Sequence, residues 1–207
     1  GWIHAISRME ELLSFAVLAR TREVSYPEVT RHEKVEVSAE NLRHPLINPS
    51  KVVPNDAAFK GGATIITGSN MSGKTTFLRT LGINLILAYA GAPVCAEKMH
   101  ADYMKIFTSM RVTDDVSNGI STFYAEILRI KSMVEYKKNE MPMLCLIDEI
   151  FKGTNSADRI VGATQVIRKL SDDHSMTLVS THDFELCDLK SESGEPAANY
   201  HFEEYYE

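Results

Sequence analysis

The stretch Ala63–Leu81, which reads ATIITGSNMSGKTTFLRTL, decides the fold of this chain. An apolar run rich in β-forming residues comes first, a glycine loop follows, and the loop opens directly into a helical pattern. Residues 68–75 fill the phosphate-loop pattern G-x-x-x-x-G-K-[ST]. We therefore predict a strand at 63–67 and a helix at 74–90 in an α/β P-loop NTPase fold, a mainly parallel sheet flanked by helices.

The residues of this loop are suited to holding phosphate. Gly68 and Gly73 let the backbone bend so that successive N–H groups point at an anion, and the start of the helix adds its positive end. Lys74 would reach the β- and γ-phosphates of a nucleotide, and Thr75 would place its hydroxyl on Mg²⁺. An ordinary glycine turn is the alternative, but the strand and the helix that the motif requires both flank the loop, which favours binding of a nucleotide triphosphate.

The composition is typical of one globular domain. With 207 residues and 44% apolar content, the chain can bury one core. Its 22 basic and 28 acidic residues give a net charge of −6, which argues against a broad nucleic-acid surface in this segment. The longest uncharged run lies between Arg79 and Glu97 and contains Gly91 and Pro93. It is too short to span a membrane, so we expect no membrane contact by this segment.

The cysteines indicate the cellular compartment of the protein, and the chain ends indicate whether the sequence is a piece of a longer protein. Cys95, Cys145 and Cys187 lie far apart without a C-x-x-C pair, which favours reduced thiols in a cytoplasmic protein. The chain begins with Gly-Trp rather than Met and stops inside an aromatic run at 201–207. We expect an excised piece of a longer protein, with a short processed protein as the alternative.

Apolar residues in Trp2–Arg22 recur close to a 3.6-residue period with charges between them, which predicts an amphipathic helix. This helix either connects to a missing upstream domain or packs on its own domain. We divide the chain into a connecting helix at 1–24 and one domain at 25–207. Further short strands are expected at 34–37, 93–96 and 104–110.

The continuous apolar run Met143–Ile147 predicts a central parallel strand buried on both faces, and it ends in Asp148 and Glu149. Ligands of open α/β sheets bind at such strand ends. Asp148 would hold Mg²⁺, and Glu149 would polarise the water that attacks the γ-phosphate. A turn followed by a helix cap is the alternative, which the phosphate loop upstream makes weaker.

Two further polar residues lie at the ends of predicted elements. A buried strand at 176–180 ends just before His182, which is thereby placed to contact the γ-phosphate or the attacking water; a histidine with only a structural hydrogen bond is the alternative. Ser121 begins a helix predicted at 121–139, so its hydroxyl would either bind a phosphate or simply cap the helix. Asn155 would cap a later helix that runs to about Leu170.

Four segments, in this order and spacing, resemble the C-terminal ATPase domain (domain V) of the MutS family of DNA mismatch repair proteins: TGSNMSGKTTFLRTLG, FTSMRVTDDVSNGISTFYAE, LCLIDEIFKGTNSADR and STHDFEL. RHPLI and VPND upstream match the same domain, so the resemblance covers the chain from Trp2 to about Phe202. It implies an ABC-type P-loop ATPase, truncated at its C-terminus, that works as a homodimer with two composite sites. DNA would be bound through domains absent from this chain.

The resemblance also implies a role for each site residue. Glu149 would be the catalytic carboxylate, His182 the histidine that senses the γ-phosphate, and Lys74 a contact to the transferred phosphate. Thr75 and Asp148 would hold Mg²⁺. The residues expected to bind ATP are Val52, Gly68, Ser69, Asn70, Met71, Ser72, Gly73, Lys74, Thr75 and Thr76.

Three residues are implied to act across the dimer. Ser121 would be the signature serine that binds the ATP of the partner subunit. Asn155 and Ser156 fall in the loop after the carboxylates, which crosses the dimer interface in the family.

The chain departs from the family pattern in several places. Ser69 and Ser72 stand where Pro and Gly are common, and Val52 stands where an aromatic residue usually stacks on adenine. The loop 151–159 resembles that of an outlying MutS-like group. One alternative is therefore another ABC-type ATPase without a mismatch repair role, although the LSGGQ-like signature of transporters is missing before Ser121. The other is a nucleotide-gated dimerisation module without turnover, against which the second carboxylate argues.

Overall fold

The computed structural model describes residues 1–110, 122–151, 155–191 and 194–203 of the chain. These residues fall into two compact units. The first unit comprises Gly1–Thr30, Val37–Ala58 and Arg79–Tyr103. The second comprises Arg31–Glu36, Phe59–Leu78 and Met104–Glu207.

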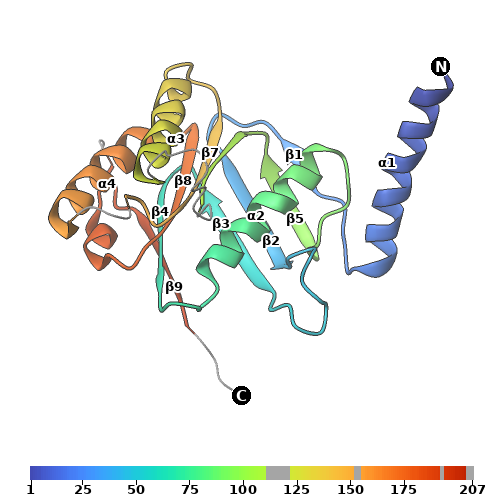
Figure 1. Cartoon of the computed structure of the whole chain (residues 1–207), viewed down its shortest axis with the longest axis horizontal. Helices are drawn as coiled ribbons and strands as arrows, with labels where there is room; N and C mark the ends of the chain where they lie inside the picture. The colour runs from blue at the N-terminus through green and yellow to red at the C-terminus, as the bar shows by residue number, and fades with distance from the viewer. Residues whose placement is uncertain (111–121, 152–154, 192–193, 204–207) are drawn as a thin grey trace. The chain divides into compact units, whose positions relative to one another are not determined.

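Five parallel strands form the sheet of the second unit (Figure 1). Their order across the sheet is β6 (Lys105–Ser109), β7 (Met143–Asp148), β8 (Ser175–Ser180), β4 (Gly62–Gly68) and β9 (Ala198–Phe202). Every residue of β7 and β8 is buried, as expected for central parallel strands. Because the strands are parallel, the residues that follow β4, β7 and β8 come to the same edge of the sheet.

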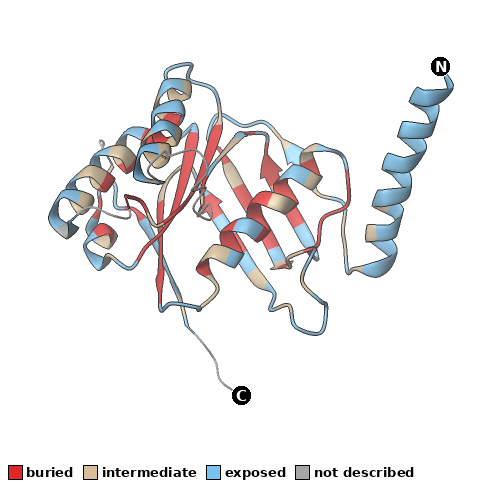
Figure 2. Ribbon diagram, in the orientation of Figure 1, coloured by how far each residue is buried: buried red, intermediate tan, exposed pale blue. Residues whose placement is uncertain are grey.

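Two helices provide the crossovers that parallel strands require. α3 (Thr122–Lys137) leads from β6 to β7, and α4 (Ser156–Leu170) leads from β7 to β8. Figure 2 shows buried residues along these strands and on part of each helix. The buried residues that the helices share with the sheet are Ile65, Ile130, Met133, Cys145, Ile147, Ala163, Ile167, Leu170 and Val179. Both helices therefore cover the same face of the sheet.

The first unit contains a four-stranded mixed sheet. Its order is β1 (Glu28–Thr30), β5 (Lys98–Asp102), β2 (Glu36–Leu42) and β3 (Asn55–Lys60). β5 pairs parallel with β1 and antiparallel with β2. α2 (Lys74–Tyr89) begins in the second unit and continues into the first. There the Asn84 side chain donates to the Arg43 carbonyl at 3.0 Å and accepts from the Cys95 N–H at 2.7 Å.

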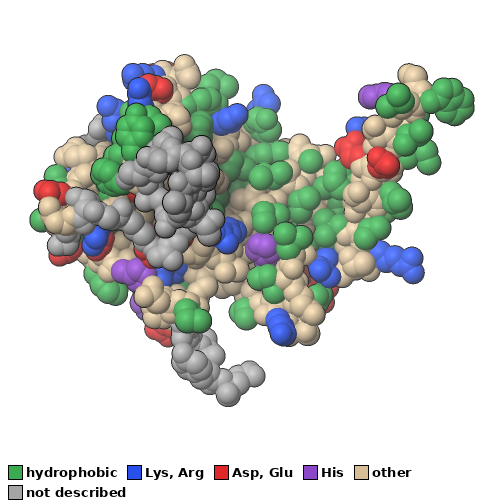
Figure 3. Space-filling model, viewed as in Figure 1, with side chains coloured by type: hydrophobic (Ala, Val, Ile, Leu, Met, Phe, Trp, Pro, Cys, Tyr) green, Lys and Arg blue, Asp and Glu red, His purple; other side chains and the backbone are tan. Residues whose placement is uncertain are grey.

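The N-terminal helix α1 spans Trp2–Thr21, which confirms the predicted helix. All of its residues are described, and none of them is buried. Figure 3 shows its apolar side chains on the surface. The exposed large ones are Trp2, Ile3, Ile6, Met9, Leu12, Leu13 and Val17. Whether this helix connects to an upstream domain or packs on its own domain stays open. The domain boundary at residue 24 stays a prediction.

The predicted mixed α/β architecture, with a parallel sheet flanked by helices, is confirmed. The helices and strands expected around the glycine loop, the carboxylates and His182 lie within about two residues of their predicted bounds. In the described part of the chain, no helix is both long and apolar enough to cross a membrane.

Some elements away from the glycine loop, the carboxylates and His182 were wrongly predicted. Residues 93–96 do not form a strand, because Val94 makes only an isolated bridge to Ser25 and the strand lies at β5 instead. The sequence of β5 gives no apolar strand pattern, because three of its five residues, Lys98, His100 and Asp102, are polar. The strand expected at 34–37 begins at Glu36 and continues to Leu42.

Candidate functional site

The glycine loop connects the end of β4 to the start of α2 through a backbone with three positive φ angles. Gly68, Met71 and Gly73 have φ values of 144°, 71° and 97°, all in the left-handed range. A Cβ on Gly68 would lie 2.4 Å from the carbonyl oxygen of Phe202, so only glycine fits there. Met71 is 96% exposed at the tip of the loop. Turns of this kind form concave anion sites when they precede a helix.

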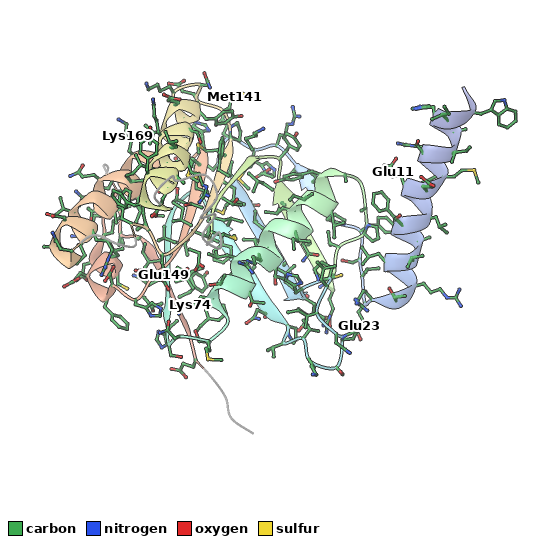
Figure 4. All side chains as sticks on the ribbon, in the orientation of Figure 1. Glu11, Glu23, Lys74, Met141, Glu149 and Lys169 are labelled. Carbon is green, nitrogen blue, oxygen red and sulfur yellow. The ribbon has the colours of Figure 1, made fainter. Side chains whose placement is uncertain are left out.

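The Lys74 ammonium group is held inside its own loop. The residue is only 6% exposed, and Nζ donates to the carbonyls of Gly68 at 2.7 Å and Ser69 at 2.6 Å. A buried ammonium group requires such acceptors. The same donors would serve phosphate oxygens when an anion enters the loop. Figure 4 labels Lys74 at the start of α2.

Asp148 ends β7, and two hydroxyl groups donate to its carboxylate. Thr75 Oγ1 donates to both carboxylate oxygens, at 2.9 and 3.0 Å, and Ser180 Oγ donates to Oδ1. Asp148 is only 7% exposed, so its carboxylate depends on these donors. A hydroxyl oxygen and a carboxylate in contact are hard oxygen ligands of the kind that Mg²⁺ prefers. Thr75 and Asp148 therefore fit a magnesium ion.

Glu149 faces His182 at the same edge of the sheet. The His182 Nε2 atom lies 3.1 Å from Glu149 Oε1, and the two side chains are 38% and 22% exposed. The Glu149 backbone has a φ of 57°, and its N–H donates to the Ser180 carbonyl at 2.9 Å. This conformation lies outside the regular strand geometry, and strain of this kind is common at functional sites. Glu149 is labelled in Figure 4, directly after β7.

The segment after the carboxylates is tied to both flanking helices. The Phe151 N–H donates to Glu126 Oε1 of α3 at 2.6 Å, and Phe151 has a φ of 58°. Asn155 caps α4, as predicted, because its side chain accepts from the Asp158 N–H at 2.9 Å. These contacts hold Phe151 and Asn155, the described residues on either side of 152–154.

A bidentate ion pair joins α4 to the residue that follows His182. Arg159 Nε donates to Asp183 Oδ2 at 2.8 Å, and Arg159 Nη2 donates to Oδ1 at 2.7 Å. The side chains of Arg159 and Asp183 are 26% and 19% exposed. Arg159 belongs to the first turns of α4, and Asp183 directly follows His182.

The structure brings most of the predicted site residues to one edge of the five-stranded sheet. Asn70 and Thr76 are exposed beside the loop, while Val52 is half-buried in the first unit. Ser121 lies outside the described residues, as does the side chain of Ser156. Their roles stay predictions.

Sequence reasoning missed three contacts of this site. Ser180 could have been found, because it is the last residue of a buried strand that ends two residues before His182. The pairing of Glu126 with Phe151 and of Arg159 with Asp183 carries no local signal in the sequence.

Comparison with known proteins places these residues in a family context. The family model described as MutS domain V matches residues 64–205. The chain is similar to the DNA mismatch repair protein MutS of Staphylococcus haemolyticus, at 35% identity over 195 residues, which covers 90% of this chain and 22% of that protein. It is 37% identical to the MutS protein of Thermus aquaticus over 149 residues, or 71% of this chain and 18% of that protein. The corresponding protein of Bacillus pumilus is 36% identical over 200 residues, or 92% and 22%. The chain thus spans about a fifth of the length of these curated relatives.

Proposed function

This chain belongs to the MutS domain V family, and on that premise we propose that it binds ATP with Mg²⁺ and hydrolyses the ATP to ADP and phosphate. One observation carries the proposal. The Thr75 hydroxyl, directly after the loop lysine, contacts the Asp148 carboxylate at the end of a neighbouring strand. A phosphate loop and a cation-binding carboxylate that meet in this way are the arrangement that P-loop NTPases use.

The loop would bind the phosphates of ATP. Lys74 would exchange the carbonyls of Gly68 and Ser69 for the β- and γ-phosphate oxygens, while the loop N–H groups and the start of α2 add further positive potential. Ser69, Asn70, Met71, Ser72, Gly73 and Thr76 complete the expected phosphate contacts. Bound Mg²⁺ would neutralise charge on the β- and γ-phosphates, with Thr75 and Asp148 as its protein ligands.

Glu149 and His182 would carry the chemical step. Glu149 Oε1 would accept a proton from a water molecule as the water oxygen bonds to the γ-phosphorus and the bond to the β-phosphate oxygen breaks. His182 pairs with that same oxygen, so it would orient the carboxylate and contact the γ-phosphate. ATP and water are consumed, and ADP and phosphate are released.

The names of the relatives support a proposal for the role of a longer protein that contains this domain. The relatives are named as DNA mismatch repair proteins, and we propose that this domain couples ATP hydrolysis to conformational change in a MutS-like protein of the same kind. DNA would be bound by parts outside this chain, in agreement with its net charge of −6. Two copies of the domain would form a homodimer, with Ser121, Asn155 and Ser156 facing the partner subunit.

The decisive experiment measures phosphate release at saturating Mg·ATP. The native chain is expected to turn over, and Glu149→Gln is expected to keep ATP binding but to lose roughly 10²–10⁴ in rate, because an amide does not accept the proton. Glu135→Gln on α3 is the matched control and should hydrolyse normally, since Glu135 is an exposed partner of Lys131. ATP binding without turnover in the native chain would support the nucleotide-gated module instead.

A second experiment tests the composite site. If Ser121 of one copy completes the ATP site of another, specific activity rises with protein concentration, and Ser121→Ala abolishes that rise. Activity independent of both concentration and Ser121 would show a self-sufficient ATPase and would overturn the dimer mechanism.

A further inference from the structure

The ion pair between Arg159 and Asp183 has no part in the function proposed above, although it lies next to the site. Both guanidinium contacts are short, at 2.8 and 2.7 Å, and the two side chains are mostly buried. A bidentate pair of this geometry fixes both the position and the rotation of the carboxylate. It is therefore more restrictive than an ordinary surface ion pair.

The ion pair restrains the short segment 181–183, which contains His182. Asp183 directly follows His182, and the Asp183 N–H donates to Thr181 Oγ1 at 3.0 Å, which closes a turn around the histidine. On the other side, the Thr181 N–H donates to the Ile66 carbonyl of β4 at 3.0 Å. The residues before and after His182 are thus held by different elements, β4 and α4.

The turn that is held in this way places the His182 ring next to the Glu149 carboxylate. His182 Nε2 lies 3.1 Å from Glu149 Oε1, and the Glu149 N–H is bound to the carbonyl of Ser180, just before the turn. A small rotation of the turn would move the ring along with it. Because Asp183 is clamped by Arg159, such a rotation requires α4 to shift or the bidentate pair to break.

We propose that Arg159 is a positioning residue, which acts through Asp183 to hold the His182 ring against Glu149. The consequence for the reaction rests on the proposed ATPase function. Misplacement of a catalytic group by about 1 Å can cost up to about 10²-fold in rate, which is the scale of effect that a lost clamp can produce. The clamp also links α4 to the histidine, so a movement of α4 would reach the site through this pair.

The kinetic test uses the full chain and compares Arg159→Ala with Arg168→Ala. Arg168 lies on the same helix, but its Nε donates to the Lys190 carbonyl, away from the histidine. Arg159→Ala should lower kcat roughly tenfold, leave KM for Mg·ATP unchanged and be partly rescued by Arg159→Lys, whereas Arg168→Ala should keep the native rate. In a His182→Gln background, Arg159→Ala should cause no further loss. An equal loss in both backgrounds, or a change in KM alone, would overturn the inference.

A second measurement does not depend on turnover. The ring resonances of His182, assigned by their loss in His182→Gln, are followed by NMR in the nucleotide-free chain. Arg159→Ala and Asp183→Ala should shift these resonances by similar amounts, and Arg168→Ala should not. If the native chain fails to hydrolyse ATP, the proposed function fails while this readout still decides the positioning role. Unchanged resonances in Arg159→Ala would overturn that role even in an active ATPase.

Discussion

The Thr75 hydroxyl donates a hydrogen bond to both carboxylate oxygens of Asp148, at 2.9 and 3.0 Å, across 73 residues of sequence. Thr75 belongs to the first turn of α2, and Asp148 is the last residue of β7. The contact joins the glycine loop to the end of β7. It brings together a hydroxyl and a carboxylate from separate elements, which supports the proposed Mg²⁺ site.

Replacement of Asp148 should remove the dependence of ATP binding on Mg²⁺. In the native chain, ATP should bind more tightly with Mg²⁺ than with EDTA, because the cation links the phosphates to the protein. In Asp148→Asn this difference should largely disappear, as measured by calorimetric titration with and without the cation. Asp188→Asn is the matched control, because Asp188 is an exposed carboxylate at the end of η2 (Phe184–Asp188). A full Mg²⁺ effect in Asp148→Asn would place the cation elsewhere.

Loss of the Lys74 ammonium group should weaken ATP binding with or without Mg²⁺. Lys74→Ala should cost about 1.5–3 kcal/mol of ATP affinity, the range for a charge-assisted hydrogen bond. Lys169→Ala removes an exposed lysine at the end of α4, labelled in Figure 4, and should bind normally. Unchanged affinity in Lys74→Ala would refute the phosphate-binding role of the loop.

Alanine substitutions in the loop should separate crowding from backbone strain. Gly68→Ala should destabilise the fold more than Gly73→Ala, since its Cβ would lie 2.4 Å from the Phe202 carbonyl oxygen and 2.8 Å from Ser72 Oγ. At Gly73 no atom lies within 4 Å of the added Cβ, so only the positive φ opposes alanine. Strain alone costs about 1–3 kcal/mol, and Gly68→Ala should exceed the Gly73→Ala value in denaturant unfolding. Equal midpoints for the two variants would show that the Phe202 backbone moves away easily.

The centre of the fold could be predicted from the sequence because its signals are local. The run Met143–Ile147 is apolar throughout and is followed by two carboxylates, and the strand before His182 is likewise buried along its whole length. Parallel strands place their carboxyl ends at one edge, so these residues and the glycine loop had to converge. The mixed sheet of the first unit has no such signal, since the burial of β5 depends on its strand partners.

The detailed contacts of the site depend on register and were beyond sequence reasoning. Ser180 reaches Asp148 because the two are paired across β7 and β8, a one-residue match that composition does not determine. The clamp of Asp183 by Arg159 needs both the start of α4 and the turn after β8 to be fixed first. Sequence patterns therefore predicted which residues meet, but not which hydrogen bonds orient them.

The three thiols should differ in reactivity. Burial raises the pKa of the Cys145 thiol to about 12, and burial also raises the pKa of Cys95. Cys187 is only half-buried, and its pKa is raised by burial and by the charge of Asp188. At pH 8 a disulfide reagent should therefore modify Cys187 first, while Cys95 and Cys145 react only after unfolding in guanidinium chloride. Cys187→Ser should remove the early reaction; rapid labelling of Cys145 in the native chain would contradict its burial.

The ion pair between Lys137 and Asp172 should make stability depend on acid pH. Lys137 Nζ contacts Asp172 and the Ser175 hydroxyl, and so joins the last turn of α3 to the turn before β8. Burial alone would raise the pKa of Asp172, but the hydrogen bonds from Lys137 and Ser175, together with the lysine charge, outweigh it and lower the pKa. A carboxyl whose pKa is lower in the folded state stabilises the fold above its unfolded pKa of about 3.9 and loses that contribution as pH falls through the folded value.

Lys137→Met should therefore lower the free energy of unfolding by about 0.2–1 kcal/mol at pH 7, the range for a partly exposed pair. The difference from the native chain should shrink as the pH falls below the unfolded pKa of about 3.9 and should vanish once the pH is below the lowered pKa of folded Asp172. Thermal unfolding followed by circular dichroism across this pH range measures both values. Lys131→Met removes an exposed ion pair six residues earlier on α3 and should show little effect at any pH. A constant difference between Lys137→Met and the native chain at all pH values would show that Lys137 acts through packing rather than through the charge of Asp172.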